Sequence, residues 1–315
     1  MIFLILVMSG YMWIIGNEMK KYSVYFTLNS SYIKFGRIWI ESLHDRVNMN
    51  NVKNIFISDT GLKQRDREYF LNFDKVKIID SGVTSNFDEG TWGKGWHQSV
   101  TSKTKVLKEL VKNNDEPIVM IDGDCMFLDD ISYLINTDYD LQICHRPHLE
   151  QLGIAHLASF VSVNNKKCLD FIDEWIDEIK KGSIVDEQGK NRAKETPSLN
   201  RVVKNNINNY DIQNIPENWV SVMRLHEVTR NSVIAHFKGR DISKTFDELF
   251  QKRVIGRGWG DIIKKYVRRA YLKQSKISSY EKQFRKRYKA LHGSTKNASK
   301  AYLKHMVAAR KYPWV

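Results

Sequence analysis

Two aspartates that flank a glycine, Asp122-Gly123-Asp124, suggest chemistry most directly in this 315-residue chain. They follow the run Pro117–Ile121, which has no polar interruption and is typical of a strand buried on both faces in a parallel sheet. Ligands of open α/β sheets bind beyond the carboxyl ends of the strands, and carboxylate oxygens suit Mg²⁺ or Mn²⁺. The pattern therefore predicts a divalent-cation site, where Gly123 lets the backbone approach a ligand closely.

A nucleophilic role for the first aspartate is the competing interpretation. Phosphatases of the haloacid dehalogenase type also place Asp-x-Asp after an apolar strand. Their motif follows the first strand of the catalytic domain, whereas three strand–helix units precede it here and Cys125-Met126 replaces the expected pattern. We therefore favour the cation site.

The elements that must position these carboxylates alternate along the chain. Apolar and β-branched runs predict strands at Tyr22–Leu28, Val52–Ser58, Val76–Asp80 and Pro117–Ile121. Helical spacing of apolar residues predicts helices at Phe35–Leu43, Lys63–Phe70 and Ser102–Lys112. Alternation of this kind indicates an α/β fold with a parallel sheet.

Composition sets further limits. With 42% hydrophobic and 27% charged residues, the chain is neither wholly disordered nor a multi-span membrane protein. Its length fits one domain of roughly 230–250 residues with an appendage. The three cysteines, Cys125, Cys144 and Cys168, have no zinc-site spacing, and their odd number argues against a disulfide framework. We therefore predict a reducing, cytoplasmic compartment.

The net charge of +14 belongs to the C-terminal tail. Residues 250–315 hold 19 Lys and Arg against two acidic residues, whereas residues 1–249 hold 31 basic and 34 acidic residues, a net charge of −3. Apolar and aromatic residues recur between Asp261 and Leu291, which predicts a basic amphipathic helix. Such a helix suits packing on the body, an anionic membrane surface or nucleic acid, and we favour the first two.

The N-terminal residues 2–15 are almost wholly apolar. This run is shorter than the about 20 residues that span a bilayer, and it lacks the positive start of a signal peptide. A short signal anchor, a membrane-dipping segment and an extension upstream of a natural start at Met19 all stay open. We favour the extension, because Lys20-Lys21-Tyr22 leads directly into the first predicted strand.

Four blocks, in the same order, resemble GT-A-fold glycosyltransferases, the nucleotide-diphospho-sugar transferases, with the nearest likeness to family 8. They are similar to the family's nucleotide-binding turn, Asp-x-Asp strand, DQxxLN helix motif and late His-x-x-Gly motif. The blocks are Phe26–Tyr32, Val119–Phe127 with Asp129-Asp130-Ile131 after it, Glu195–Asn200, and Ile234–Gly239. The resemblance covers about residues 22–245 and implies a Rossmann-like, mostly parallel central sheet flanked by helices. We expect an apolar segment at 1–18, a GT-A domain at 19–248 and a basic helical tail at 249–315.

The resemblance also implies a donor and metal site. Asp122, Asp124 and His236 would bind Mn²⁺ or Mg²⁺, and Asp122 would also reach the donor's ribose. Glu195 would join the two aspartates as a catalytic residue by accepting hydrogen bonds from sugar hydroxyls, although Thr196 stands where the family has glutamine. The implied donor-binding residues are Leu28, Asn29, Tyr32, Lys103, Lys105, Asp122, Gly123, Lys238 and Gly239.

Some of these assignments have plain alternatives. Tyr32 would stack on the nucleotide base, or it is a core tyrosine. Lys103 and Lys105 compete for a single basic contact to the donor, or both are solvated helix lysines. His236 would complete the metal site, or it is a hydrogen-bonded core histidine.

The predicted function is metal-dependent transfer of a sugar from a nucleotide-diphospho-sugar, by resemblance a UDP-sugar, to an unidentified glycan, lipid or protein acceptor. The tail would hold the protein peripherally at an anionic membrane. A nucleic-acid-binding protein and a nucleotidyltransferase of related fold are the alternatives. The latter would need a glycine-rich phosphate loop after the first strand, and Asn29-Ser30-Ser31 contains no glycine.

Overall fold

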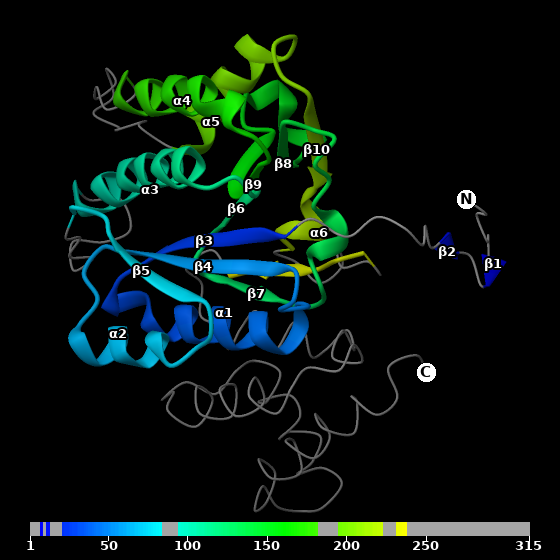
Figure 1. The fold of residues 1–315 in the computed structure, drawn as a ribbon. Helices are drawn as coiled ribbons and strands as arrows, with labels where there is room; N and C mark the ends of the chain where they lie inside the picture. The colour runs from blue at the N-terminus through cyan, green and yellow to red at the C-terminus, as the bar shows by residue number, and fades with distance from the viewer. Residues whose placement is uncertain are drawn as a thin grey trace, which may run out of the picture.

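The computed structural model describes residues 7–8, 11–12, 21–83, 94–181, 195–222 and 231–237. Their main feature is a seven-stranded sheet with helices on both faces (Figure 1). The strand order is β10-β8-β9-β6-β3-β4-β5. In chain order the strands are β3 (Tyr22–Leu28), β4 (Val52–Asp59), β5 (Val76–Asp80), β6 (Ile118–Ile121), β8 (Leu141–His145), β9 (His156–Val163) and β10 (Ile212–Pro216).

The sheet is mostly parallel, as predicted. Strand β3 pairs in parallel with β4 and with β6, and β4 pairs in parallel with β5. Strand β9 runs antiparallel to its neighbours β6 and β8, and β10 is parallel to β8. The carboxyl ends of β3, β4, β5 and β6 therefore meet at one edge, where ligands bind in open α/β sheets.

Helices cover both faces of this sheet (Figure 1). On β6, Val119 and Ile121 face the core beneath α1 and α2, whereas Ile118 and Met120 face the core beneath the other three long helices. Burial of both faces explains the uninterrupted apolar run. The helices are α1 (Ile33–Arg46), α2 (Gln64–Leu71), α3 (Lys94–Asn113), α4 (Leu169–Lys181), α5 (Glu195–Asn206) and the short α6 (Glu217–Val220).

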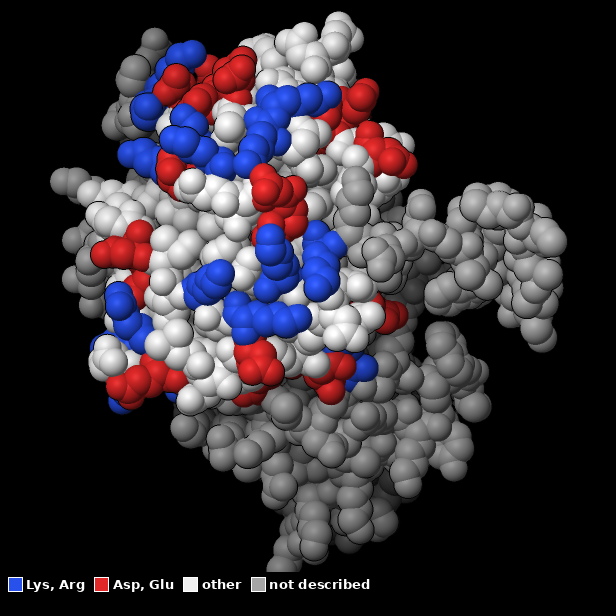
Figure 2. Space-filling model, viewed as in Figure 1, with Lys and Arg blue, Asp and Glu red and all other residues white. Residues whose placement is uncertain are grey.

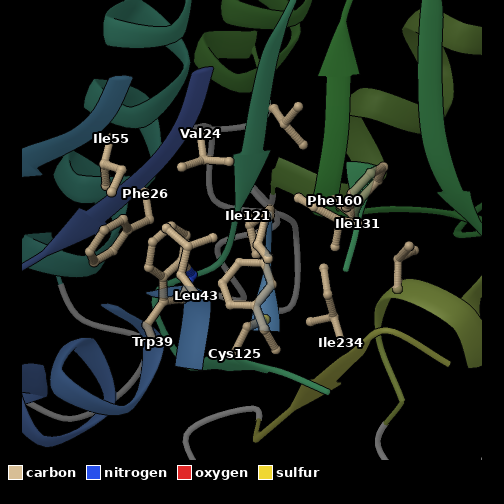
Figure 3. Packing of buried hydrophobic residues seen from close by; sticks show 14 of the residues in the cluster. Val24, Phe26, Trp39, Leu43, Ile55, Ile121, Cys125, Ile131, Phe160 and Ile234 are labelled. Carbon is tan, nitrogen blue, oxygen red and sulfur yellow. The ribbon is translucent and has the colours of Figure 1, made fainter. Parts of the chain in front are cut away.

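An aromatic contact ties α1 to the strands that carry the site (Figure 3). Trp39 of α1 stacks on Phe26 of β3, with ring centroids 4.0 Å apart, and meets Phe127 edge-on at 5.0 Å. All three side chains are fully buried, and burial of each stabilises the fold by roughly 1.5–3 kcal/mol. The backbone N–H of Phe127 also donates to the buried Ser42 hydroxyl at 3.0 Å. Helix α1 thus fixes the segment that follows the Asp-x-Asp motif.

A second, two-stranded sheet lies beside the first. Strand β7 (Cys125–Phe127) pairs antiparallel with β11 (Ile234–His236), and His236 stands opposite Cys125. The backbone N–H of Phe237 donates to the Asp124 carbonyl at 2.9 Å. This pairing brings a residue more than one hundred positions away in sequence next to the Asp-x-Asp motif.

Residues near the N-terminus form a short hairpin-like pair, β1 (Val7–Met8) with β2 (Tyr11–Met12). The predicted basic helix of the tail lies outside the described residues. Within the part of the chain that the structure describes, no helix combines the length and apolar character needed to cross a membrane.

Acidic and basic side chains lie side by side on the described face in Figure 2, in keeping with the nearly neutral body.

Candidate active site

Asp122 and Asp124 follow directly on β6, at the edge where the parallel strands end. The backbone N–H of Asp122 donates to the Ser159 carbonyl of β9 at 3.0 Å, which fixes the start of the turn. A Cβ on Gly123 would lie 2.7 Å from the Thr27 carbonyl oxygen. Glycine is therefore required because the β3 backbone passes close by, which is a different reason from the ligand approach that the sequence suggested.

His236 completes a cluster with the two aspartates. Its Nε2 atom lies 3.2 Å from Oδ1 of Asp124 and 3.6 Å from Oδ2 of Asp122. The imidazole is buried, and its Nδ1 atom lies 2.8 Å from the Ser221 hydroxyl, which in turn accepts a hydrogen bond from Ser159 at 3.0 Å. A cation on Nε2 requires the ring proton on Nδ1, where the Ser221 oxygen can accept it.

The spacing of His236 from each aspartate fits a hard divalent cation. Two ligands at right angles around such an ion, with bonds of about 2.1 Å, lie ~3 Å apart. The spacings of 3.2 and 3.6 Å between His236 and the aspartates are close to that value. Two carboxylates and one imidazole are ligands that Mn²⁺ accepts. Its remaining coordination positions would be open to oxygen atoms of the nucleotide-sugar.

Lys103 is the buried cation of the site. Its Nζ atom lies 2.5 Å from Oδ1 of Asp122 and 2.9 Å from Oε1 of Glu195, and the side chain is 7% exposed. Burial alone would lower the pKa of Lys103, but the two carboxylates outweigh it and raise that pKa. Lys105, two residues further along α3, is exposed. The structure thus brings Lys103 to the aspartates and leaves Lys105 on the solvent side of the helix.

Glu195 is the first residue of α5, and its side chain points toward Lys103. Burial raises the pKa of Glu195; Lys103 opposes this effect and the charge of Asp122 adds to it. The Glu195 carbonyl accepts a hydrogen bond from the Trp175 indole at 3.1 Å. Packing of α4 against α5 therefore places this carboxyl group near Lys103 and Asp122.

The rest of the third sequence block serves the fold. Asn200 donates to the His156 carbonyl at 2.6 Å and accepts from the His156 N–H at 2.7 Å. Thr196 accepts a long hydrogen bond, 3.4 Å, from the backbone N–H of Ala158. These side chains clamp α5 to β9, so they set the position of Glu195.

The turn after β3 is held by its own side chains. Leu28 is buried, and its carbonyl accepts from the Thr60 N–H at 3.0 Å. Asn29 is also buried, and its Oδ1 atom accepts from the Tyr32 N–H at 3.1 Å and from the Ser31 hydroxyl at 2.7 Å. Both predicted donor-binding residues therefore have a structural role in this turn, and their contact with a donor stays a prediction.

Tyr32 lies half-buried at the end of that turn. Its ring packs against Phe35, with centroids 5.3 Å apart. Burial raises the pKa of Tyr32, and the charges of Asp124 and Asp122 raise it further. Tyr32 thus belongs to the same electrostatic neighbourhood as the two aspartates, while its stacking on a base stays a prediction. Lys238 and Gly239 lie outside the described residues.

Sequence reasoning missed Ser221 and Ser159, which orient His236. Ser221 follows a short helix and belongs to no sequence motif. Its contact with His236 depends on the packing of β11 against the segment that ends at Val222, where the His236 N–H donates to the Val222 carbonyl at 2.9 Å. Such a contact between distant segments cannot be read from the sequence.

No protein-family model and no curated protein sequence matches this chain. Solved structures do match its fold. The apo structure of the bifunctional glycosyltransferase WbbM aligns with a TM-score of 0.55 at 13% identity, over 82% of this chain and 52% of that one. The structure of an active-site mutant of LgtC aligns with a TM-score of 0.50 at 13% identity, over 82% of this chain and 99% of that one.

This chain thus spans about half the length of the WbbM structure and nearly all of the LgtC structure. The described sheet order, the flanking helices and these alignments agree with one another. The expected fold class is confirmed, whereas membership of family 8 stays a prediction. The chain has the GT-A fold of glycosyltransferases.

Proposed function

We propose that this protein is a metal-dependent glycosyltransferase that moves a sugar from a nucleotide-diphospho-sugar to an acceptor. The observation that carries the proposal is the position of His236 at the carboxyl edge of the sheet, where its Nε2 atom lies 3.2 Å from Asp124 and 3.6 Å from Asp122. The shared GT-A fold supports it, because the aligned WbbM and LgtC structures have this architecture.

The charges of the site suit a diphosphate bound through a cation. Within the described residues, the ammonium of Lys103 pairs with the carboxylates of Asp122 and Glu195, and Asp124 adds a third carboxylate beside His236. A divalent ion held by Asp122, Asp124 and His236 would offset this excess and stabilise the negative charge that develops on the leaving diphosphate. Asp122 is suited to a double role, because Lys103 holds its Oδ1 atom while Oδ2 is directed toward His236.

Glu195 is proposed to contact the transferred sugar. Its carboxyl group and that of Asp122 pair with the same ammonium, that of Lys103. A carboxylate oxygen can accept hydrogen bonds from sugar hydroxyls and so orient the reacting carbon. Within the described residues, Thr196, which follows it, accepts a hydrogen bond from the backbone N–H of Ala158, and we assign it no catalytic role.

The finer details of the reaction rest on resemblance and charge. We propose a UDP-sugar as donor and a glycan, lipid or protein as acceptor, with Tyr32 against the base.

We further propose a cytoplasmic protein whose basic tail holds it at anionic membranes, since each Lys or Arg near such a surface contributes about 1 kcal/mol. Low-salt sedimentation with anionic vesicles, reversed by high salt, tests the tail; equal binding to neutral vesicles would contradict it.

A donor panel tests the main proposal. The full chain is incubated with UDP- and GDP-sugars in the presence of Mn²⁺ or Mg²⁺, and the release of nucleoside diphosphate is measured. We expect one donor to be hydrolysed well above the others, with the rate abolished by EDTA. No release from any donor, with the protein shown to be folded, would contradict the proposal.

A further inference from the structure

A thiol lies at the cation site. Cys125 is the residue after Asp124 and stands opposite His236 in the β7–β11 pair. Its sulfur, a carboxylate oxygen of Asp124 and a ring nitrogen of His236 all lie within 4.8 Å of one another. In the part of the chain that the structure describes, no other set of three His, Cys, Asp or Glu residues gathers in this way.

The surroundings of the sulfur differ from those of the carboxylates. Cys125 is fully buried and lies among apolar side chains, with Ile121 and Ile234 nearby in Figure 3. An apolar shell strengthens the attraction between a cation and a sulfur that loses its proton on binding.

The three donors differ in softness. A carboxylate oxygen suits Mg²⁺ and Mn²⁺, whereas sulfur together with imidazole selects thiophilic ions such as Zn²⁺. Zn²⁺ accepts sulfur at about 2.3 Å and nitrogen or oxygen at about 2.0–2.2 Å. A spread of 4.8 Å or less between the atoms requires small side-chain movements for all three to bind one ion.

We propose that Cys125 adds a sulfur donor to this site, so that Asp124, Cys125 and His236 bind a thiophilic divalent cation of the Zn²⁺ type more tightly than Mg²⁺. Binding replaces the S–H bond by a sulfur–metal bond and releases the proton to solvent, with no change in oxidation state. The inference rests on the proposed function only through the shared ligands Asp124 and His236. Asp122 keeps its ion pair with Lys103.

Cobalt absorption tests the sulfur directly. The metal-free full chain is titrated with Co²⁺, whose bond to a thiolate gives an intense near-ultraviolet charge-transfer band. The double variant Cys144→Ser/Cys168→Ser retains Cys125 as its single cysteine. We expect the band in the wild type and in this variant, its loss in Cys125→Ser, and its removal by Zn²⁺ but not by Mg²⁺ at equal concentration.

Zn²⁺ affinity gives a second readout. Cys125→Ser should bind Zn²⁺ at least about tenfold more weakly than the wild type. Bound Co²⁺ without a charge-transfer band in the wild type, or a band that survives in Cys125→Ser, would overturn the proposal. If Cys125→Ser does not fold, a band in the double variant that disappears in Asp124→Asn supports the same assignment, and a band that survives Asp124→Asn overturns it.

The proposal of a sulfur ligand and the proposal of transferase activity can be contradicted independently. An active enzyme without the band would contradict the sulfur donor alone. An intact band in a protein that hydrolyses no donor would support the sulfur donor and contradict the proposed function.

Discussion

The Nζ atom of Lys103 lies 2.5 Å from Oδ1 of Asp122, although the two residues are 19 positions apart. The other oxygen of Asp122 lies 3.6 Å from His236. One carboxylate thus joins a buried ammonium to the candidate cation site. The Tyr25 hydroxyl donates to the Lys103 carbonyl at 3.0 Å and so ties this turn of α3 to β3.

The first prediction concerns Lys103. Its replacement by methionine leaves Asp122 and Glu195 without their common partner, so we expect a loss of about 1–3 kcal/mol in the free energy of unfolding and a sharp fall in donor hydrolysis. Urea unfolding and nucleotide release measure the two effects. Lys105→Met, on the exposed side of the same helix, should change stability by no more than about 0.5 kcal/mol. Equal losses in both variants would mean that Lys103 has no special role.

His236 and Ser221 should act together. His236→Ala removes a proposed ligand, and Ser221→Ala removes the group that orients the ring at 2.8 Å. We expect Ser221→Ala to weaken Mn²⁺ binding by about 10–100-fold and His236→Ala to weaken it at least as much. Calorimetric titration with Mn²⁺ measures both, with the exposed His148→Ala as control. If His236→Ala unfolds the protein while Ser221→Ala binds Mn²⁺ normally, the histidine belongs to the core.

Gly123 should tolerate no side chain. The Cβ of Gly123→Ala would meet the Thr27 carbonyl at 2.7 Å, so the turn between the two aspartates must shift. We expect a loss of about 1–3 kcal/mol in stability together with weaker Mn²⁺ binding. Gly153→Ala is the matched comparison, because nothing lies within 4 Å of its Cβ and only the strain of φ 62° remains. That variant should lose about 1–2 kcal/mol and keep its Mn²⁺ affinity. Normal Mn²⁺ affinity in Gly123→Ala would show that the turn does not set the ligands.

Asp140 gives a test of pH dependence away from the site. Burial acts to raise the pKa of Asp140, but hydrogen bonds from Lys167, Asp211 N–H and Asn165 outweigh it, so the pKa is lowered in the folded protein. The unfolded state then binds the proton more tightly. Stability from this carboxylate is present above the unfolded pKa of about 3.9 and is lost as pH falls through the folded value.

Asp140→Asn should therefore cost about 1–3 kcal/mol at neutral pH and progressively less in acid. Urea unfolding of both proteins over this pH range gives the difference. A difference that stays constant down to pH values well below about 3.9 would show that charge at Asp140 is not what stabilises the native state.

The parallel half of the fold could be predicted from periodicity. Strands β3 and β5 have the predicted bounds, and β4 and β6 differ by one residue at an end. Helix α3 is longer than predicted, because its first turns lack the apolar spacing of 102–112. Strands β3, β4 and β6 are bounded by turn residues and buried on both faces, which makes their local pattern strong.

The second half was harder to predict for a physical reason. Strands β7 and β11 have three residues each and gain their stability from pairing with one another, so neither has a period to detect. Asp122 and Asp124 could be found because the buried strand before them marks a sheet edge. His236 was predicted only from the family resemblance. Ser221 was not predicted, because it meets His236 through a contact between segments that are distant in sequence.

The rate of donor hydrolysis by Asp124→Asn tests the central claim most directly. Asp124 is proposed to hold the cation, and its loss should remove several kcal/mol of transition-state stabilisation, a fall of at least about 100-fold. The exposed Asp138→Asn serves as the matched control and should hydrolyse the donor like the wild type. We expect this fall in a folded variant, together with loss of wild-type activity in EDTA. Full activity of Asp124→Asn, or undiminished wild-type activity in EDTA, would contradict a metal-dependent transferase.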